Sequence, residues 1–506
     1  MSATLKNDNS DNLSLDIDSV EHKTSHSLPM LLGRVTSIIA VVSGLVVFFG
    51  LLILAIRASV RLGIRWDTFM YHIPFSALRG GLDIPYVMND RMWQFYLGFP
   101  PLPHLIQGVL WRITGSINAT GIVNYLAFMI FLSYTHFFLK ARFWLVATIA
   151  LSAPMVIIHA ASSYVDLFGN SFLAIGLSSC LYVFLNPNEK IKLATWGGLL
   201  GLIAAAWSKY QLVPIVALSL CLFMLVVLSA KTERSEKKQL IISIFIATLL
   251  AASPYLKNLY IFGNPFWPVR MPILTDLFPY NYTVNADYSQ VPPPLKGYSQ
   301  PHLFVHSLFE IDHPTSYPDR PRWNIDQGGF WIAFRMGGFW ATGVALYLLT
   351  SICMLFACYG RRGVLASIGL IGLICFVSVL PQSHELRYYL FIPLVWSAII
   401  GILFGKFQKK YPWSAVTILV ISLISFCYMA HENQVHYQIE KVDYAKATKL
   451  WGADSMWPKL KHGVTYCAVD IMPIGILLTG PTMHEYSIVE RAEESQCPEG
   501  SSILRR

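Results

Sequence analysis

Four charged residues that lie far apart in the sequence could take part in one reaction. Asp67 stands in WDTFMYHIP, Asp166 in SSYVDLFGN, Lys209 in WSKYQ and Arg387 in SHELRYY. A carboxylate within hydrogen-bond reach of a hydroxyl can act as its general base. Fixed cations can stabilise negative charge that develops during a reaction. The chemistry that these residue types would serve is proton transfer at a centre where negative charge forms.

The composition places these residues in a membrane protein. The chain has 506 residues, of which 54% are hydrophobic and 13% are charged, whereas soluble domains carry about a quarter charged residues. The net charge of +9 does not indicate a nucleic-acid partner, because Lys and Arg fall between the apolar segments, where the positive-inside rule puts them. We therefore predict an α-helical polytopic membrane protein whose partner is the lipid bilayer.

Eleven apolar segments are predicted to form transmembrane helices. They are Val35–Ile56, Gly121–Leu139, Phe143–His159, Leu167–Leu185, Leu193–Trp207, Leu212–Leu228, Leu240–Leu256, Gly337–Cys358, Val364–Leu380, Tyr389–Phe404 and Trp413–Met429. The fifth and sixth segments are short, so one broken hairpin is an alternative for that pair.

Basic residues determine the expected orientation. Every second loop is basic, for example at Lys140 and Arg142, whereas Lys209 and Arg387 are the basic residues of the short loops on the other side. The positive-inside rule then places the N-terminus in the cytoplasm and, with an odd number of spans, the C-terminus outside. We predict a cytoplasmic, disordered N-terminus over residues 1–34, followed by an uncleaved signal anchor.

Two outer segments are larger than simple connections. Residues 57–120 contain Asp67 and the stretch Leu102–Ile113, whose apolar residues share one helical face and predict an interfacial helix. Residues 257–336 are rich in Pro and aromatic residues, and loops of this length are usually functional.

The polar tail, residues 431–506, is expected to form a small exported cap. Short apolar runs at Val464–Val469, Ile474–Leu478 and Tyr486–Val489 predict strands, and hence a small α/β domain. Export would also allow a disulfide between Cys467 and Cys497.

Each of the four charged residues has a structural explanation as well. Asp67 and Asp166 could cap the helices that follow them, because Asp is a favoured N-cap. Lys209 could extend its ammonium group to the interface, and Arg387 could anchor a helix end. These separate explanations do not predict two acids and two cations on one side of a membrane, whereas a site does.

Three arginines do not follow the positive-inside rule. Arg57, Arg61 and Arg65 stand on the outer side, and their spacing of four would place them on one helical face. An interfacial anchor is one explanation. We favour the other, a cationic track for a lipid phosphate, because guanidinium groups match phosphate oxygens.

The order of these motifs resembles the GT-C superfamily of membrane glycosyltransferases, which take sugars from polyprenyl phosphates. WDTFMYHIP places an Asp in the first outer segment, GFPPLPHLIQGVLWRITG leads into an amphipathic helix, and SSYVDLFGN places a second Asp at the fourth span. WSKYQ, KNLYIFGNPFWP and a late RYY follow in the same order. The resemblance implies a GT-C-like bundle over residues 35–430 with helices in its outer loops.

The resemblance also implies roles for individual residues. Asp67 would be the general base, and Asp166 would hold the acceptor or a divalent metal beside Asp67. The cations that bind the donor phosphate would be Lys209, Arg387, Arg61 and Arg65. The residues that position the sugar or the acceptor would be Tyr71, His72, His384 and Glu385. The first acid is not doubled as in the commonest form of the family, so a metal cofactor is left open. Direct displacement of the phosphate would invert the sugar carbon.

A second metal site is a weaker alternative in the large loop. His302 and His306 lie one helical turn apart, with Glu310 another turn on and His313 nearby, and this spacing could bind a metal. A polar face of a loop helix is the explanation that we favour.

The expected activity is transfer of one hexose, with glucose as the first choice, at the periplasmic face of a bacterial inner membrane. The expected acceptor is a glycan or a lipid-linked glycan, namely the O antigen of lipopolysaccharide; lipid A and protein are alternatives. A flippase of lipid-linked sugars is the alternative from another class. Transporters usually show internal repeats and polar groups at the membrane midplane, whereas this sequence shows no internal repeat and its polar residues gather at one surface. A further alternative is a polymerase or ligase that transfers a whole oligosaccharide. It would differ from the expected enzyme in using a larger donor.

Overall fold

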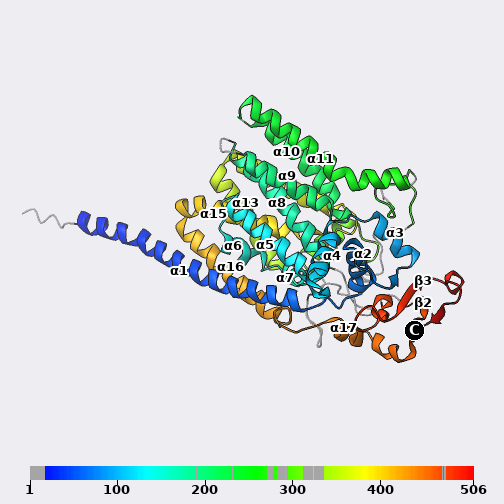
Figure 1. The fold of residues 1–506 in the computed structure, drawn as a ribbon. Helices are drawn as coiled ribbons and strands as arrows, with labels where there is room; N and C mark the ends of the chain where they lie inside the picture. The colour runs from blue at the N-terminus through cyan, green and yellow to red at the C-terminus, as the bar shows by residue number, and fades with distance from the viewer. Residues whose placement is uncertain are drawn as a thin grey trace, which may run out of the picture.

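The computed structural model describes residues 17–187, 191–230, 232–270, 277–281, 291, 295–311, 323, 336–469, 471 and 474–505. Its apolar helices form one bundle, and a smaller domain lies at one end of it (Figure 1). The helices of the bundle are α1 (Ile17–Val60), α5 (Ile122–Phe137), α6 (Phe143–Ala150), α7 (Pro154–Ala160), α8 (Asp166–Leu185), α9 (Lys192–Ala206), α10 (Val213–Ser229), α11 (Arg234–Phe262), α13 (Ala341–Tyr359), α14 (Arg361–Ser378), α15 (Phe391–Lys410) and α16 (Pro412–Glu432).

The helices confirm the prediction of a polytopic membrane protein. Within the described residues, nine helices are long and apolar enough to cross a membrane. The third predicted span is instead the pair α6 and α7, bent by 100°, and α9 has 15 residues. Helices α9 and α10 are separate elements. Helix α1 begins at Ile17, so the predicted disordered segment contains helix from that residue on; residues 1–16 lie outside the described part.

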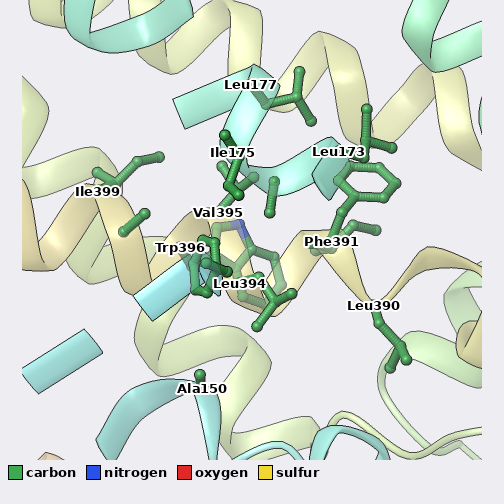
Figure 2. Packing of buried hydrophobic residues seen from close by; sticks show 14 of the residues in the cluster. Ala150, Leu173, Ile175, Leu177, Leu390, Phe391, Leu394, Val395, Trp396 and Ile399 are labelled. Atoms are coloured by element: carbon green, nitrogen blue, oxygen red, sulfur yellow. The ribbon is translucent and has the colours of Figure 1, made fainter. Parts of the chain in front are cut away.

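Helices α8 and α15 form the centre of the bundle. In each of them, 83% of the most apolar stretch of 18 residues is buried. This burial explains why both sequences are apolar on every side. Figure 2 shows the two helices meeting through Leu173 and Ile175 of α8 and Val395 and Trp396 of α15. Because both are enclosed by other helices, their first residues are held at fixed positions relative to each other.

One buried amide ties the start of α15 to the start of α8. The Asn170 side chain accepts a hydrogen bond from the Phe391 backbone N–H at 2.9 Å and donates one to the Asp166 carbonyl at 2.7 Å. The Phe391 N–H is one of the N-terminal donors of α15 that have no partner within the helix, so the Asn170 amide satisfies it. Asn170 therefore aligns the segment that carries Arg387 with the segment that carries Asp166.

The first outer segment folds into short helices at the same end of the bundle as the C-terminal domain (Figure 1). It contains α2 (Ile73–Arg79), α3 (Asp90–Gly98) and α4 (Leu102–Thr114). Helix α4 confirms the helix predicted over Leu102–Ile113. Its apolar face is open, with Ile113 75% exposed, whereas His104 and Gln107 on the other face are buried.

The C-terminal domain contains a parallel four-stranded sheet with the order β1-β3-β2-β4. Its strands are β1 (Tyr86–Val87), β2 (Thr465–Val469), β3 (Ser487–Arg491) and β4 (Ser502–Leu504), and the domain also holds α17 (Tyr444–Leu450). Strand β1 comes from the first outer segment, and residues of both segments share one core. The cap therefore folds together with that segment.

One predicted strand in the tail is wrong. Residues Gly475–Thr479 form a 3₁₀ helix instead of a strand over Ile474–Leu478. All five are buried, and a short run that is apolar throughout fits a buried helix as well as a buried strand. Cys467 of β2 and Cys497 are joined by a disulfide.

Three of the sequence motifs meet between the bundle and the outer segment. The Gly98 carbonyl accepts hydrogen bonds from Tyr210 Oη at 2.6 Å and Asn258 Nδ2 at 2.8 Å. A Cβ atom at Gly98 would lie 2.1 Å from the Trp267 carbonyl oxygen, so only glycine fits there. GFPP, WSKYQ and KNLYIFGNPFWP each contribute residues to this junction. The junction also places Lys209 beside the first outer segment.

Candidate active site

Asp67 lies at the entrance to a π-helical turn, Thr68–His72, in the segment between α1 and α2. Its side chain does not cap that turn. Instead, Oδ2 accepts a hydrogen bond of 3.1 Å from Tyr71 Oη. The structure therefore argues against the capping explanation for Asp67 and joins two residues that the sequence singled out.

Arg387 brings the late span to Asp67. Its Nη1 lies 3.8 Å from Asp67 Oδ2, and its Nε lies 3.3 Å from Glu385 Oε2. The Arg387 and Glu385 side chains are 5% and 1% exposed, whereas Asp67 is 16% exposed. Charged groups this deeply buried require close partners, and Asp67 is the carboxylate of this group with the most access to solvent.

Asp166 and Lys209 form a second ion pair beside the first. Lys209 Nζ donates to Asp166 Oδ1, which is buried at the start of α8. Lys209 Nζ lies 4.0 Å from the centre of the Tyr388 ring, and Arg387 Cζ lies 4.8 Å from the same centre. One aromatic ring therefore holds both cations next to each other.

Histidines lie next to Tyr71, whose ring centroid is 4.2 Å from that of His72. His72 Nδ1 and His104 Nε2 are 2.9 Å apart, so they share one hydrogen bond. The Tyr164 ring lies 5.0 Å from His72 and 6.0 Å from His159 between centroids. Burial lowers the pKa of His72 to about 3, so its ring is neutral at physiological pH.

Some ring nitrogens in this cluster are buried without a hydrogen-bond partner among the described residues. They are His72 Nε2, His159 Nδ1 and His159 Nε2. Buried polar atoms are normally paired, so an orphaned one in a native structure needs an explanation such as a ligand or ordered water. His159 was not a candidate in the sequence, because a lone histidine in an apolar run carries no functional signal.

Four of the predicted site residues lie elsewhere or have another contact. Arg61 Nη1 lies 3.3 Å from Glu440 Oε2, and the neighbouring Arg57 donates to the carbonyls of Val435 and Gln438. The sequence therefore did not reveal that these arginines face the segment after α16, and no contact in the described structure joins them to Lys209 or Arg387. Arg65 is half-buried. His384 is buried, and its carbonyl accepts from Ser307 Oγ at 2.5 Å, while Glu385 contacts Arg387.

The carboxylates do not fit a metal site. Lys209 forms an ion pair with Asp166, and Arg387 and Tyr71 contact Asp67. The neighbours of both acids are therefore hydrogen-bond donors. No group of three or more metal-ligating side chains occurs in the described residues. In the large loop, Glu310 accepts from Trp323 Nε1 at 2.8 Å and from the Gly338 N–H at 3.1 Å, and His313 lies outside the described residues.

Two solved structures share this fold. The crystal structure of ArnT from Cupriavidus metallidurans bound to undecaprenyl phosphate gives a TM-score of 0.53 at 13% identity, over 91% of this chain and 90% of that chain. The apo state of the same protein gives a TM-score of 0.51 at 13% identity, over 90% and 87%. No protein family and no curated protein matches the chain by sequence. The chain therefore shares the fold of these ArnT structures, and the predicted polytopic helical fold is confirmed.

Proposed function

We propose that this protein is a membrane glycosyltransferase that moves one sugar from a polyprenyl-phosphate carrier to an acceptor hydroxyl. The observation that carries the proposal is the contact between Arg387 and Asp67, beside the Asp166–Lys209 pair. A carboxylate with some access to solvent and two cations held in ion pairs are the groups that such a reaction needs.

The proposed reaction is a single displacement. The acceptor oxygen attacks the anomeric carbon, and its proton passes to a carboxylate oxygen of Asp67. The bond between the anomeric carbon and the phosphate oxygen breaks, and the electron pair leaves with the polyprenyl phosphate. Lys209 and Arg387 stabilise the added negative charge on that oxygen. One displacement inverts the configuration of the sugar carbon.

Asp166 and Glu385 then serve to position the cations. Asp166 holds Lys209, and Glu385 holds the Nε side of Arg387. Cations that are already fixed do not reorganise when charge develops, which is the main source of electrostatic catalysis. Under this proposal, Asp166 binds Lys209 and has no part in binding a metal.

The sugar lies against the histidine side of the site in this proposal. Tyr71 Oη is hydrogen-bonded to Asp67, and His72 and His159 have buried ring nitrogens that can donate to or accept from sugar hydroxyls. Hydroxyl groups of a hexose would satisfy these atoms. The His384 backbone carbonyl accepts from Ser307 of the large loop, and this proposal assigns His384 no contact with the sugar.

The carrier and acceptor are proposed on different grounds. ArnT, which has the same fold, was crystallised with undecaprenyl phosphate, and this supports a polyprenyl phosphate as the carrier. The periplasmic O antigen of lipopolysaccharide remains our proposed acceptor and glucose our proposed sugar, in a bacterial inner membrane with the N-terminus inside. Lipid A and protein are the alternative acceptors.

Purified full-length protein in liposomes tests the activity. Polyprenyl-phosphate glucose with a labelled sugar is supplied with O-antigen acceptor, and label in the acceptor is the expected result. A protein that moves the labelled lipid between leaflets and leaves the sugar bond intact would instead be a flippase. Mass analysis of envelope glycans from cells with and without the gene identifies the sugar and its acceptor.

A further inference from the structure

A second feature with binding chemistry lies at the opposite end of the bundle from the candidate active site. Between the end of α5, the start of α6 and the last turns of α15, the surface is hollowed by about 480 Å³. Its lining includes His136, Lys140, Arg142, Trp144, Gly401 and Gly405, and we call it the basic groove. Gly405 lies about 20 Å along α15 from Phe391, at 1.5 Å per residue.

The charged side chains of the groove are basic. Lys140 and Arg142 lie on its wall, and His136 Nδ1 is 2.9 Å from the Ala141 carbonyl. Arg142 Cζ lies 5.5 Å from the centre of the Phe404 ring, and its Nη2 donates to Gln408 Oε1 at 3.4 Å. Lys140 and Arg142, two positions apart in one hollow, match the charge of a phosphate group.

The groove also meets the lipid-facing surface. Phe137 and Phe138 at the end of α5 are 73% and 47% exposed, and Trp144 lies in the lining. Aromatic side chains of this kind are typical of the level of lipid headgroups. A free ion would use the cations and not these rings.

The glycines explain why the surface is hollow there. A Cβ atom at Gly401 would lie 2.4 Å from Val146 Cγ2, so Gly401 permits close packing of α15 against α6. At Gly405, a Cβ atom would meet no atom within 4 Å. Gly405 therefore faces open space, and that space could be filled by a side chain without disturbing the helices.

The positive-inside rule accounts for the presence of the cations but not for their arrangement. Arg361 and Arg362 at the start of α14 satisfy the same rule outside the groove. We propose that the basic groove binds the phosphate of an anionic phospholipid headgroup, with Lys140 and Arg142 on the phosphate and Trp144 beside the glycerol. Basic pockets between transmembrane helices bind such headgroups by this chemistry.

Titration of the full-length protein in detergent with phosphatidylglycerol, followed by native mass spectrometry, tests the proposal. The double variant Lys140→Gln/Arg142→Gln should bind phosphatidylglycerol about tenfold more weakly, since each cation near a lipid surface contributes to anionic-lipid binding. Gly405→Trp should lower the affinity at least as much by filling the groove, without loss of either cation.

Two matched variants serve as controls. Arg361→Gln/Arg362→Gln removes the same charge from the exposed start of α14, and Gly369→Trp adds the same side chain at an exposed glycine whose Cβ would also meet no atom within 4 Å. Both should bind phosphatidylglycerol as the unchanged protein does. The proposal is overturned if Gly405→Trp binds normally, or if the Arg361→Gln/Arg362→Gln protein loses as much affinity as the groove variant. Neither result depends on sugar transfer.

Discussion

The guanidinium group of Arg387 lies 3.8 Å from the carboxylate of Asp67. The contact joins the first outer segment to the start of α15, which are far apart in the sequence. Glu385 and the Tyr388 ring hold the same guanidinium from other sides. The distance between the proposed base and a proposed phosphate cation is therefore fixed, and fixed geometry of this kind is what lowers the barrier to a displacement.

Asp67→Asn tests the proposed base. The amide keeps the shape of the side chain but cannot accept the acceptor's proton, so transfer should fall by about 10² to 10⁴. The measurement is the initial rate of label transfer in liposomes at equal amounts of inserted protein. Asp83→Asn changes an exposed acid of the same outer segment and should transfer normally. Normal transfer by Asp67→Asn would remove Asp67 from the chemistry.

Lys209→Met tests the second ion pair. The substitution leaves the buried Asp166 carboxylate without its cation, which costs about 3 to 5 kcal/mol for a buried pair. The protein should unfold at a lower temperature than the unchanged protein and should need more lipid donor for half-maximal rate. The double variant Asp166→Asn/Lys209→Met removes both charges, so it should regain most of the stability and none of the donor affinity. Equal melting of the single and double variants would argue against the pair.

His159→Phe separates a role in sugar binding from a structural one. Phenylalanine fills a similar volume and removes two buried nitrogens that have no partner in the described structure, so the folded protein should not lose stability. If His159 contacts the sugar, kcat/KM for the sugar donor should fall about tenfold or more while the melting temperature holds. Unchanged kinetics would show that His159 is only a packing residue.

The apolar spans were predictable because a span needs a long apolar run, and composition reveals that directly. The bend between α6 and α7 was not, since the run from Phe143 to Ala160 is apolar enough for one span even though Ser152 and Pro154 stand at the break. Strand β1 has two residues, too few to show alternation. Its pairing with β3 joins segments that are far apart in the sequence, so no local pattern predicts it.

Part of the candidate site was also predictable from the composition of the sequence. Asp67, Asp166, Lys209 and Arg387 stand out because charges are rare near spans, and the structure brings these four together. The spacing of Arg61 and Arg65 showed a shared helical face but not what that face touches. His159 became visible only through its distance from Tyr164.

Acid should destabilise the protein through its buried histidines. Burial is the main cause that lowers the pKa of His72 to about 3, and Lys209 and Arg387 add to the shift while Asp166 opposes it. Burial also lowers the pKa of His104. Below the unfolded pKa of about 6.5, the unfolded chain binds protons that the folded chain does not, so stability is full above pH 6.5 and falls as the pH drops, by about 1.4 kcal/mol per unit for each histidine.

Melting temperatures between pH 6.5 and 5 measure this dependence in a window where most carboxylates stay ionised. The variant His72→Gln/His104→Gln should show a flatter dependence than the unchanged protein. His462→Gln changes an exposed histidine of the C-terminal domain and should keep the original slope. A slope that the double variant leaves unchanged would place the acid sensitivity elsewhere.

Cys497→Ser tests what the disulfide does for the C-terminal domain. Cys467 and Cys497 are 30 positions apart, and cross-linking a loop of that length stabilises a fold by about 3 to 4 kcal/mol. The variant should be cut faster by protease after β3 and should lose the mobility shift that the unchanged protein shows on reduction. Cys221→Ser, at an exposed cysteine of α10, should behave as the unchanged protein. Because β1 of the first outer segment pairs with β3, loosening the domain should also lower transfer, whereas reactive free thiols at both positions in the unchanged protein would contradict the bond.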